Sequence, residues 1–87
     1  MIVTSASSVV GRGVVSTAGL VQGSIVQASP GGLEMLTRAH DEAIERMVRN
    51  AQTLGANAVI DVRFSTACVM DSLIEVLAYG NAVLLDT

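Results

Sequence analysis

The fold of this chain is set by residues 33–64, which read LEMLTRAHDEAIERMVRNAQTLGANAVIDVRF. In the first two thirds of this stretch, apolar residues recur at helical spacing and form one stripe of an amphipathic helix. The residues of this stripe are Leu33, Leu36, Ala43, Ile44, Met47, Ala51 and Leu54. The pattern predicts one helix over about 33–54. Before it, Ser29-Pro30-Gly31-Gly32 ends the preceding strand, and after it Gly55 occupies a left-handed position that ends the helix.

Charged residues support the same helix. Seven of the thirteen charged residues of the chain lie between Glu34 and Arg49, and all of these except Arg46 are on the side opposite the apolar stripe. Three acidic residues each precede an arginine by four positions, an arrangement that adds a few tenths of a kcal/mol to a helix. These pairs are Glu34–Arg38, Glu42–Arg46 and Glu45–Arg49.

On both sides of the helix the apolar pattern changes to an alternating one. Ala58, Ile60, Val62 and Phe64 alternate with their neighbours, which predicts a strand with one buried face, followed by a tip around 67–72 and a last strand over 73–85. Before the helix, 9–10 and 14–27 are rich in Val, Ile and Thr, and the glycines among them are typical of bulges or close backbone approach. We therefore expect an α+β fold in two layers. It consists of one β-β-α-β-β domain over residues 1–87, with one long helix on a mainly antiparallel sheet.

Composition points to self-association. The chain has 87 residues, of which 51% are hydrophobic and 15% charged. A domain this small has too little interior to bury so much apolar surface, so we expect a homo-oligomer. All five basic residues are arginine and the net charge is −3, which argues against nucleic-acid binding and against attachment to anionic membranes. One cysteine and no signal-peptide pattern favour a reducing, cytoplasmic location.

Three residues are candidate metal ligands. Cys68 and Met70 offer a thiolate and a thioether, the soft donors that suit Cu(I) and other thiophilic elements. One such pair per chain is too few for tight binding, but several copies around a symmetry axis would form a soft ring. The alternative is that Cys68 is a small buried hydrophobe and Met70 fills a gap. His40, on the apolar stripe of the helix, is either a ligand or proton carrier at a subunit contact or a neutral core histidine.

The sequence contains no convincing enzyme motif, so we expect no catalytic residue and no bound organic cofactor. Gly11-Arg12-Gly13 begins like a dinucleotide fingerprint, but Ser16 replaces the third glycine and a strand follows instead of a helix. Asp61 and Arg63 are two residues apart on one strand, which is more typical of an ion pair at a surface or interface than of a catalytic pair.

Three segments resemble the YbjQ-like family. They are GANAVIDVRF at 55–64, EVLAYGNAV at 75–83 and DEAIERMV at 41–48, and GLVQG at 19–23 matches less closely. The resemblance implies a dodecin-like β/α sandwich, assembly into pentameric rings, and a heavy-metal-binding role without an established reaction. The chain departs from the family pattern at Ser65, Ala67 and Asn81, where the family has aspartate, serine and threonine. The loss of the aspartate weakens a site for a hard cation, whereas Cys68 and Met70 favour a soft one.

Taken together, these features predict a ring-forming cytoplasmic protein, expected to be a pentamer, that binds a soft metal or metalloid ion through Cys68, with Met70 and His40 as weaker candidate ligands. The alternative is a structural or protein-interaction ring with neither metal nor catalysis. The sequence does not identify a protein partner.

Overall fold

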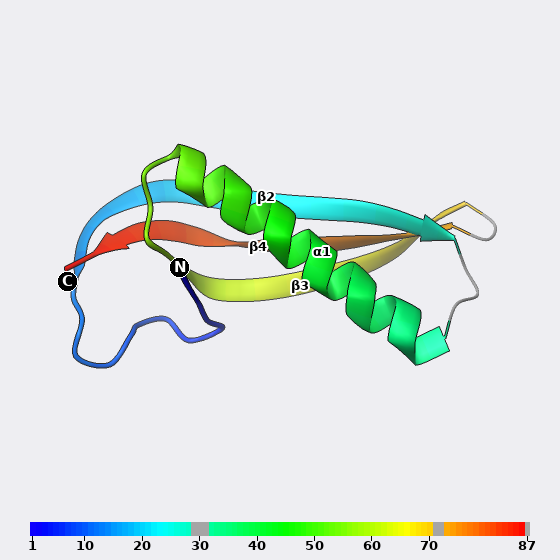
Figure 1. Cartoon of the computed structure of the whole chain (residues 1–87), viewed down its shortest axis with the longest axis horizontal. Coiled ribbons are helices and arrows are strands. Elements are labelled where there is room, and N and C mark those ends of the chain that lie inside the picture. The colour runs from blue at the N-terminus through cyan, green and yellow to red at the C-terminus, as the bar shows by residue number, and fades with distance from the viewer. Residues whose placement is uncertain (29–31, 71–72, 87) are drawn as a thin grey trace.

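In a computed structural model of the chain, which describes residues 1–28, 32–70 and 73–86, one helix lies diagonally across one face of a sheet (Figure 1). The elements are β1 (Ile2–Val3), β2 (Val14–Ala28), α1 (Gly32–Thr53), β3 (Ala58–Met70) and β4 (Leu73–Leu85). The strands form one sheet in the order β1-β3-β4-β2. The pairs β3–β4 and β2–β4 are antiparallel, and β1 pairs with β3 in parallel. The predicted α+β class and two-layer arrangement are confirmed, and the sheet is mixed.

The first strand differs from the prediction. The segment expected at Val9–Val10 is wrong as a strand, because Val9 forms only an isolated bridge with Arg12 within the described residues. The strand in the sheet is instead β1, which pairs with Ala58 and Val59 at the outer edge of β3. Two residues are too short for a recognisable alternating pattern, and their position depends on a partner far along the chain.

The helix packs through small residues. Its fully buried positions are Ala39, Ala43, Met47 and Ala51, which confirms the centre of the predicted stripe and adds Ala39 to it. Leu54, the last residue of the predicted stripe, is not part of the buried face, because it lies beyond the end of α1 and is 53% exposed. The opening break at 29–31 and the side chains of Leu33 and Glu34 lie outside the described part of the structure.

Close contact between α1 and β2 depends on Gly23. A Cβ atom at this position would collide with the backbone N of Met47 and the backbone O of Ala43, and would lie 2.8 Å from the Cβ of Arg46. Val21 and Ile25, on either side of Gly23, are buried beneath the helix. The glycine therefore sets the spacing between the two layers, as the sequence predicted for glycines in this strand.

The other end of the helix is joined to the sheet by a short, well-fixed turn. Gly55 has φ of 78°, which confirms the predicted left-handed residue after the helix. Asn57 then donates from Nδ2 to the carbonyl O of Leu85 at 3.1 Å and accepts from the N–H of Leu85 at 2.8 Å. A second apolar cluster forms at this end from Ala58, Ile60, Val83 and Leu85, with Ile2 and Val9 packed against it.

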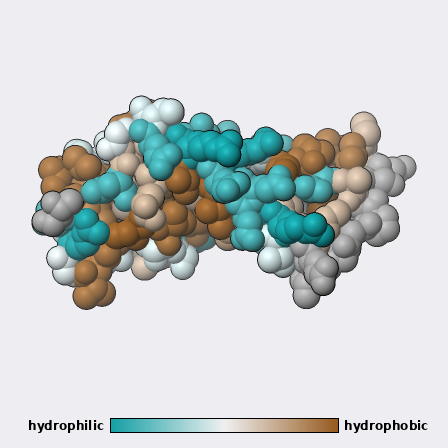
Figure 2. All heavy atoms as spheres, viewed as in Figure 1, coloured by the Kyte–Doolittle hydropathy of each residue, from teal (hydrophilic) through white to brown (hydrophobic). Residues whose placement is uncertain are grey.

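Apolar surface remains exposed over the rest of the sheet. All residues of β3 from Arg63 to Met70 are exposed, and Leu20 on β2 is 79% exposed. On the helix side, charged residues follow the helix and apolar surface lies beside it at both ends of the elongated molecule (Figure 2). The single helix therefore leaves much of the sheet uncovered.

Candidate functional site

The two candidate soft ligands lie in a strand near one end of the molecule. Cys68 and Met70 belong to β3, where Cys68 is opposite Ile74 and Met70 opposite Leu73 of β4. The predicted tip at 67–72 was therefore too long, because the strands continue to Met70 and resume at Leu73, and residues 71–72 are outside the described ranges.

Both side chains are accessible to solvent. Cys68 is an exposed free thiol and Met70 is 63% exposed. The alternative of a buried cysteine and a gap-filling methionine is therefore wrong for the single chain. A register shift between Cys68 and Met70 interrupts the regular pairing here, so the regular alternation of side chains does not apply across this pair.

A single chain does not assemble a metal centre from these residues. Within the described residues, no group of three or more His, Cys, Asp or Glu side chains lies close enough together to hold a metal ion. A Cys68 site with several thiolate ligands consequently requires more than one copy of the chain.

His40 has a structural environment. It lies on α1 beside the buried stripe and is half-buried, and its ring is 4.7 Å from the ring of Phe64 on β3, at an interplanar angle of 34°. A tilted contact at this distance is a favourable packing arrangement between rings. His40 thus helps hold the helix against β3.

Asp61 is a feature that the sequence pattern did not reveal. It has φ of 55°, and the pairing of β3 with β4 shifts register between Ile60 and Arg63. The bulge turns the backbone of β3 toward the N-terminal segment. The N–H of Asp61 donates to the carbonyl O of Ala6 at 3.0 Å, and the N–H of Val62 donates to that of Thr4 at 3.1 Å. Asparagine and aspartate tolerate this backbone region better than most residues.

The side chains at the bulge also bind the N-terminal segment. Ser7 Oγ donates to Asp61 Oδ1 at 2.7 Å, and Asn81 Nδ2 lies 3.4 Å from Asp61 Oδ2. Arg63 does not pair with Asp61 as expected, because its Nη1 donates to the carbonyl O of Ser5 at 3.0 Å and of Val62 at 2.9 Å. Both residues therefore have structural partners, and the strict alternation assumed for this strand breaks at the bulge.

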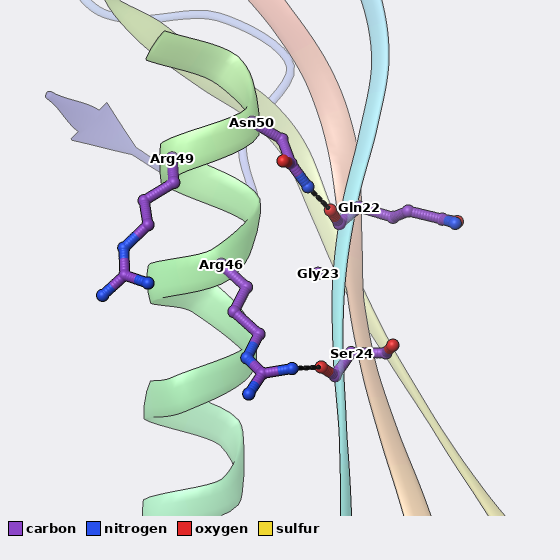
Figure 3. Close-up of a pocket in the computed structure, with 6 residues that line it drawn as sticks. All are labelled: Gln22, Gly23, Ser24, Arg46, Arg49 and Asn50. Carbon is purple, nitrogen blue, oxygen red and sulfur yellow. Dashed lines mark hydrogen bonds between the residues drawn. The ribbon is translucent and has the colours of Figure 1, made fainter. Parts of the chain in front are cut away.

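Two surface depressions flank β2. A polar one of about 390 Å³ lies between β2 and α1 and is lined by Gln22, Gly23, Ser24, Arg46, Arg49 and Asn50 (Figure 3). A more apolar one of about 430 Å³ is lined by Leu20, Val21, Gln22, Leu77 and Tyr79. No local pattern in the sequence indicates either depression, because each combines residues from elements that are distant in the chain. Across the ranges the structure describes, no helix is both long and apolar enough to cross a membrane.

Sequence similarity to known proteins extends over nearly the whole chain. A UPF0145 protein of Photobacterium profundum is 35% identical over 95% of this chain and 98% of its own length, and a UPF0145 protein of Thermosipho africanus is 40% identical over 95% and 94%. A solved structure from Pediococcus pentosaceus, of a DUF74 protein with unknown function, superposes with a TM-score of 0.81 over 99% of this chain and 98% of that one. At 19% identity, this last similarity concerns the fold alone.

The family model that matches covers residues 31–86, which include the GANAV and AYG segments and the whole of α1. Its description is "Putative heavy-metal-binding". The match spans more than half of the chain, and the relatives above agree with it. The chain therefore belongs to the YbjQ family, and these relatives are UPF0145 proteins.

Proposed function

We propose that this chain forms a homo-oligomeric ring, with five copies as the expected number, and that the ring binds a thiophilic metal or metalloid ion through Cys68. The observation that carries the proposal is the exposure of Cys68, which leaves its thiol free to meet a ligand or another copy. The description of the family as heavy-metal-binding agrees with this class of ligand.

The chemistry of the ligands favours a soft ion. A cysteine thiolate and a methionine thioether select Cu(I) and similar ions over Mg²⁺ or Ca²⁺, which prefer oxygen ligands. Rotational symmetry places equivalent residues of each copy at equal distances from one axis. Cys68 residues near that axis would supply several thiolates, with Met70 as a weaker ligand. His40, held against Phe64, remains the weakest candidate ligand.

Exposed apolar surface supports self-association. Val15, Leu20 and Met70 are 64%, 79% and 63% exposed in the isolated chain. Each is a large apolar side chain in contact with water, and burying it against another copy would be favourable. The face of the sheet that the helix leaves uncovered is the region that a second copy would bury.

A second function is favoured by a different observation. The depression lined by Leu20, Leu77 and Tyr79 is apolar and contains an aromatic side chain with a polar tip, features that are enriched at protein interfaces. A ring that recruits another protein through this surface, without metal or catalysis, is the alternative. It differs from the first proposal in making Cys68 dispensable.

We place the protein in the cytosol, where an exposed thiol such as Cys68 stays reduced. The proposal involves no enzymatic reaction, no nucleic acid and no membrane.

A cadmium titration tests the proposal. Cd²⁺ bound to thiolates absorbs in the near ultraviolet, so the absorbance reports sulfur ligation directly. We expect a saturable signal for the unchanged protein, loss of the signal in Cys68→Ser, and a weaker effect in Met70→Leu. Because Cys68 is exposed, the serine variant keeps the fold, which circular dichroism checks. Unchanged binding by Cys68→Ser refutes the role of the cysteine and favours the interaction ring.

A further inference from the structure

The polar depression between β2 and α1 has an unusual set of lining groups. Two of the five arginines of the chain, Arg46 and Arg49, lie one turn apart on the helix and line it together. None of the six described residues that line it is acidic, although the chain as a whole carries a net charge of −3. A positive depression on an acidic protein is a local departure from the general charge of its surface.

The backbone of β2 is already held in place at this position. Arg46 Nη1 donates to the carbonyl O of Ser24 at 3.1 Å, and Asn50 Nδ2 donates to the carbonyl O of Gln22 at 2.6 Å (Figure 3). The carbonyl groups of Gln22 and Ser24 therefore already accept hydrogen bonds from the helix. The remaining donors that line the depression are not needed for these two carbonyls.

The same strand adds donors to the depression. The N–H and C=O groups of one strand residue point to the same side of the strand. Since the carbonyls of Gln22 and Ser24 face Asn50 and Arg46, their N–H groups face the same way. Within the described part of the sheet, β2 is an edge strand whose ladder partner is β4, so these N–H groups have no strand partner.

Donors of the two arginines also remain available. A guanidinium has five N–H donors, and the contact of Arg46 with Ser24 uses one of its nitrogens. Arg49 forms no hydrogen bond or ion pair with any other residue that the structure describes, although Glu45 is four positions before it. Figure 3 shows the Arg46 side chain turned toward β2 and that of Arg49 extending away from the strand. Arg49 is exposed and can rotate toward Arg46 without breaking a hydrogen bond or ion pair with another described residue.

We propose that this depression binds a phosphate-type oxyanion. Arg46 and Arg49 would contact it from the helix, and the N–H groups of Gln22 and Ser24 from the edge of the sheet. A tetrahedral dianion offers enough oxygen atoms to accept from both arginines and from the strand, whereas a carboxylate has two oxygens and half the charge. The volume of about 390 Å³ leaves room for an inorganic phosphate or for the phosphoryl group of a small ester.

The test is an NMR titration of the ¹⁵N-labelled full chain with inorganic phosphate at constant ionic strength. We expect saturable shifts of the Gln22 and Ser24 N–H signals. Arg49→Gln is the decisive variant, because no hydrogen bond or ion pair among the described residues is lost with it. It should weaken binding about tenfold, the usual effect of removing one charged hydrogen-bond partner. Arg38→Gln is the matched control, since it removes the same charge from an exposed position of the same helix, and it should weaken binding no more than about twofold.

Phenyl phosphate, titrated in parallel, distinguishes the two sources of the ligand. Equal binding of both probes supports recognition of the phosphoryl group of an ester, and binding of inorganic phosphate alone supports a site for the free ion. The proposal is overturned if no shift saturates below about 10 mM phosphate, if acetate binds as tightly, or if Arg38→Gln and Arg49→Gln weaken binding equally. Cys68→Ser should leave this titration unchanged, so its outcome is independent of the metal proposal.

Discussion

The contact between Gly23 and the helix yields the sharpest prediction about the fold. Replacing Gly23 by alanine adds one methyl group where β2 and α1 are closest. Two of the three atoms that it would meet are backbone atoms of α1, the N of Met47 and the O of Ala43, and the third is the Cβ of Arg46 at 2.8 Å. Side chains can rotate away from an added methyl group, but backbone atoms in the middle of a helix cannot. The helix must therefore move away from the sheet.

The size of the effect follows from what this movement disturbs. Ala43 and Met47 are fully buried on either side of the contact, and Val21 and Ile25 are buried below it. Overpacking a core typically costs about 1–3 kcal/mol. Because rigid backbone is involved, we expect the upper end, a loss of about 3 kcal/mol in the free energy of unfolding. For a domain of this length, that loss lowers the melting temperature by roughly 12–24 °C.

Thermal unfolding followed by circular dichroism, at one fixed protein concentration, measures this shift. Gly13→Ala is the matched control, because its Cβ would meet only the Asp86 carboxylate among described atoms, with Oδ2 at 3.4 Å, an ordinary contact. The control should change stability by no more than about 0.5 kcal/mol. If Gly23→Ala melts within a few degrees of Gly13→Ala, the close approach of helix and strand described here is incorrect.

Two further substitutions test the remaining contacts of the sheet. In Gly80→Ala, the new Cβ would lie 2.8 Å from Val59 Cγ1 and 2.9 Å from the carbonyl O of Ile60. Urea unfolding should therefore show a loss of about 1–3 kcal/mol in the free energy of unfolding. An unchanged urea midpoint would argue against this packing. Asn57→Ala removes both hydrogen bonds to the backbone of Leu85 and should cost about 1–3 kcal/mol. It should also speed hydrogen exchange of the Leu85 N–H, and equal exchange rates would show that this side chain does not hold the strand.

Local patterns in the sequence were sufficient for the main elements. The helix was predicted over about 33–54 and is observed over Gly32–Thr53, because its apolar spacing, its charge pairs and Gly55 all indicate the same element. The glycines of β2 were also interpreted correctly, since Gly23 lies against the helix backbone. The last strand was predicted at 73–85 and is observed there.

Features that depend on distant residues were not predictable in this way. The position of β1 depends on its pairing with Ala58 and Val59, and two residues have no detectable period. The bulge at Asp61 depends on the N-terminal segment, to which it binds through Ala6 and Ser7. Alternation alone assigns Asp61 and Arg63 to one regular face, and no local pattern in the sequence indicates that the strand pairing shifts between them.

For the candidate site, the sequence identified ligand types but not their surroundings. Cys68 and Met70 were recognised from the chemistry of sulfur, whereas their exposure on β3 required the structure. Phe64, the ring partner of His40, is 24 positions away in the chain, and the arginine depression combines residues of β2 and α1. Contacts between elements follow from tertiary packing, which local periodicity does not specify.

The most direct test of the proposed function is native mass spectrometry of protein purified without a histidine tag or added metal, with elemental analysis of the same sample. Unchanged protein and Cys68→Ser are compared. The account predicts a homo-oligomer, with five copies expected, that carries a thiophilic element in fixed ratio, and an intact but element-free oligomer for the variant. A monomer would contradict the shared assembly, and the same element in the same ratio in Cys68→Ser would contradict the cysteine site.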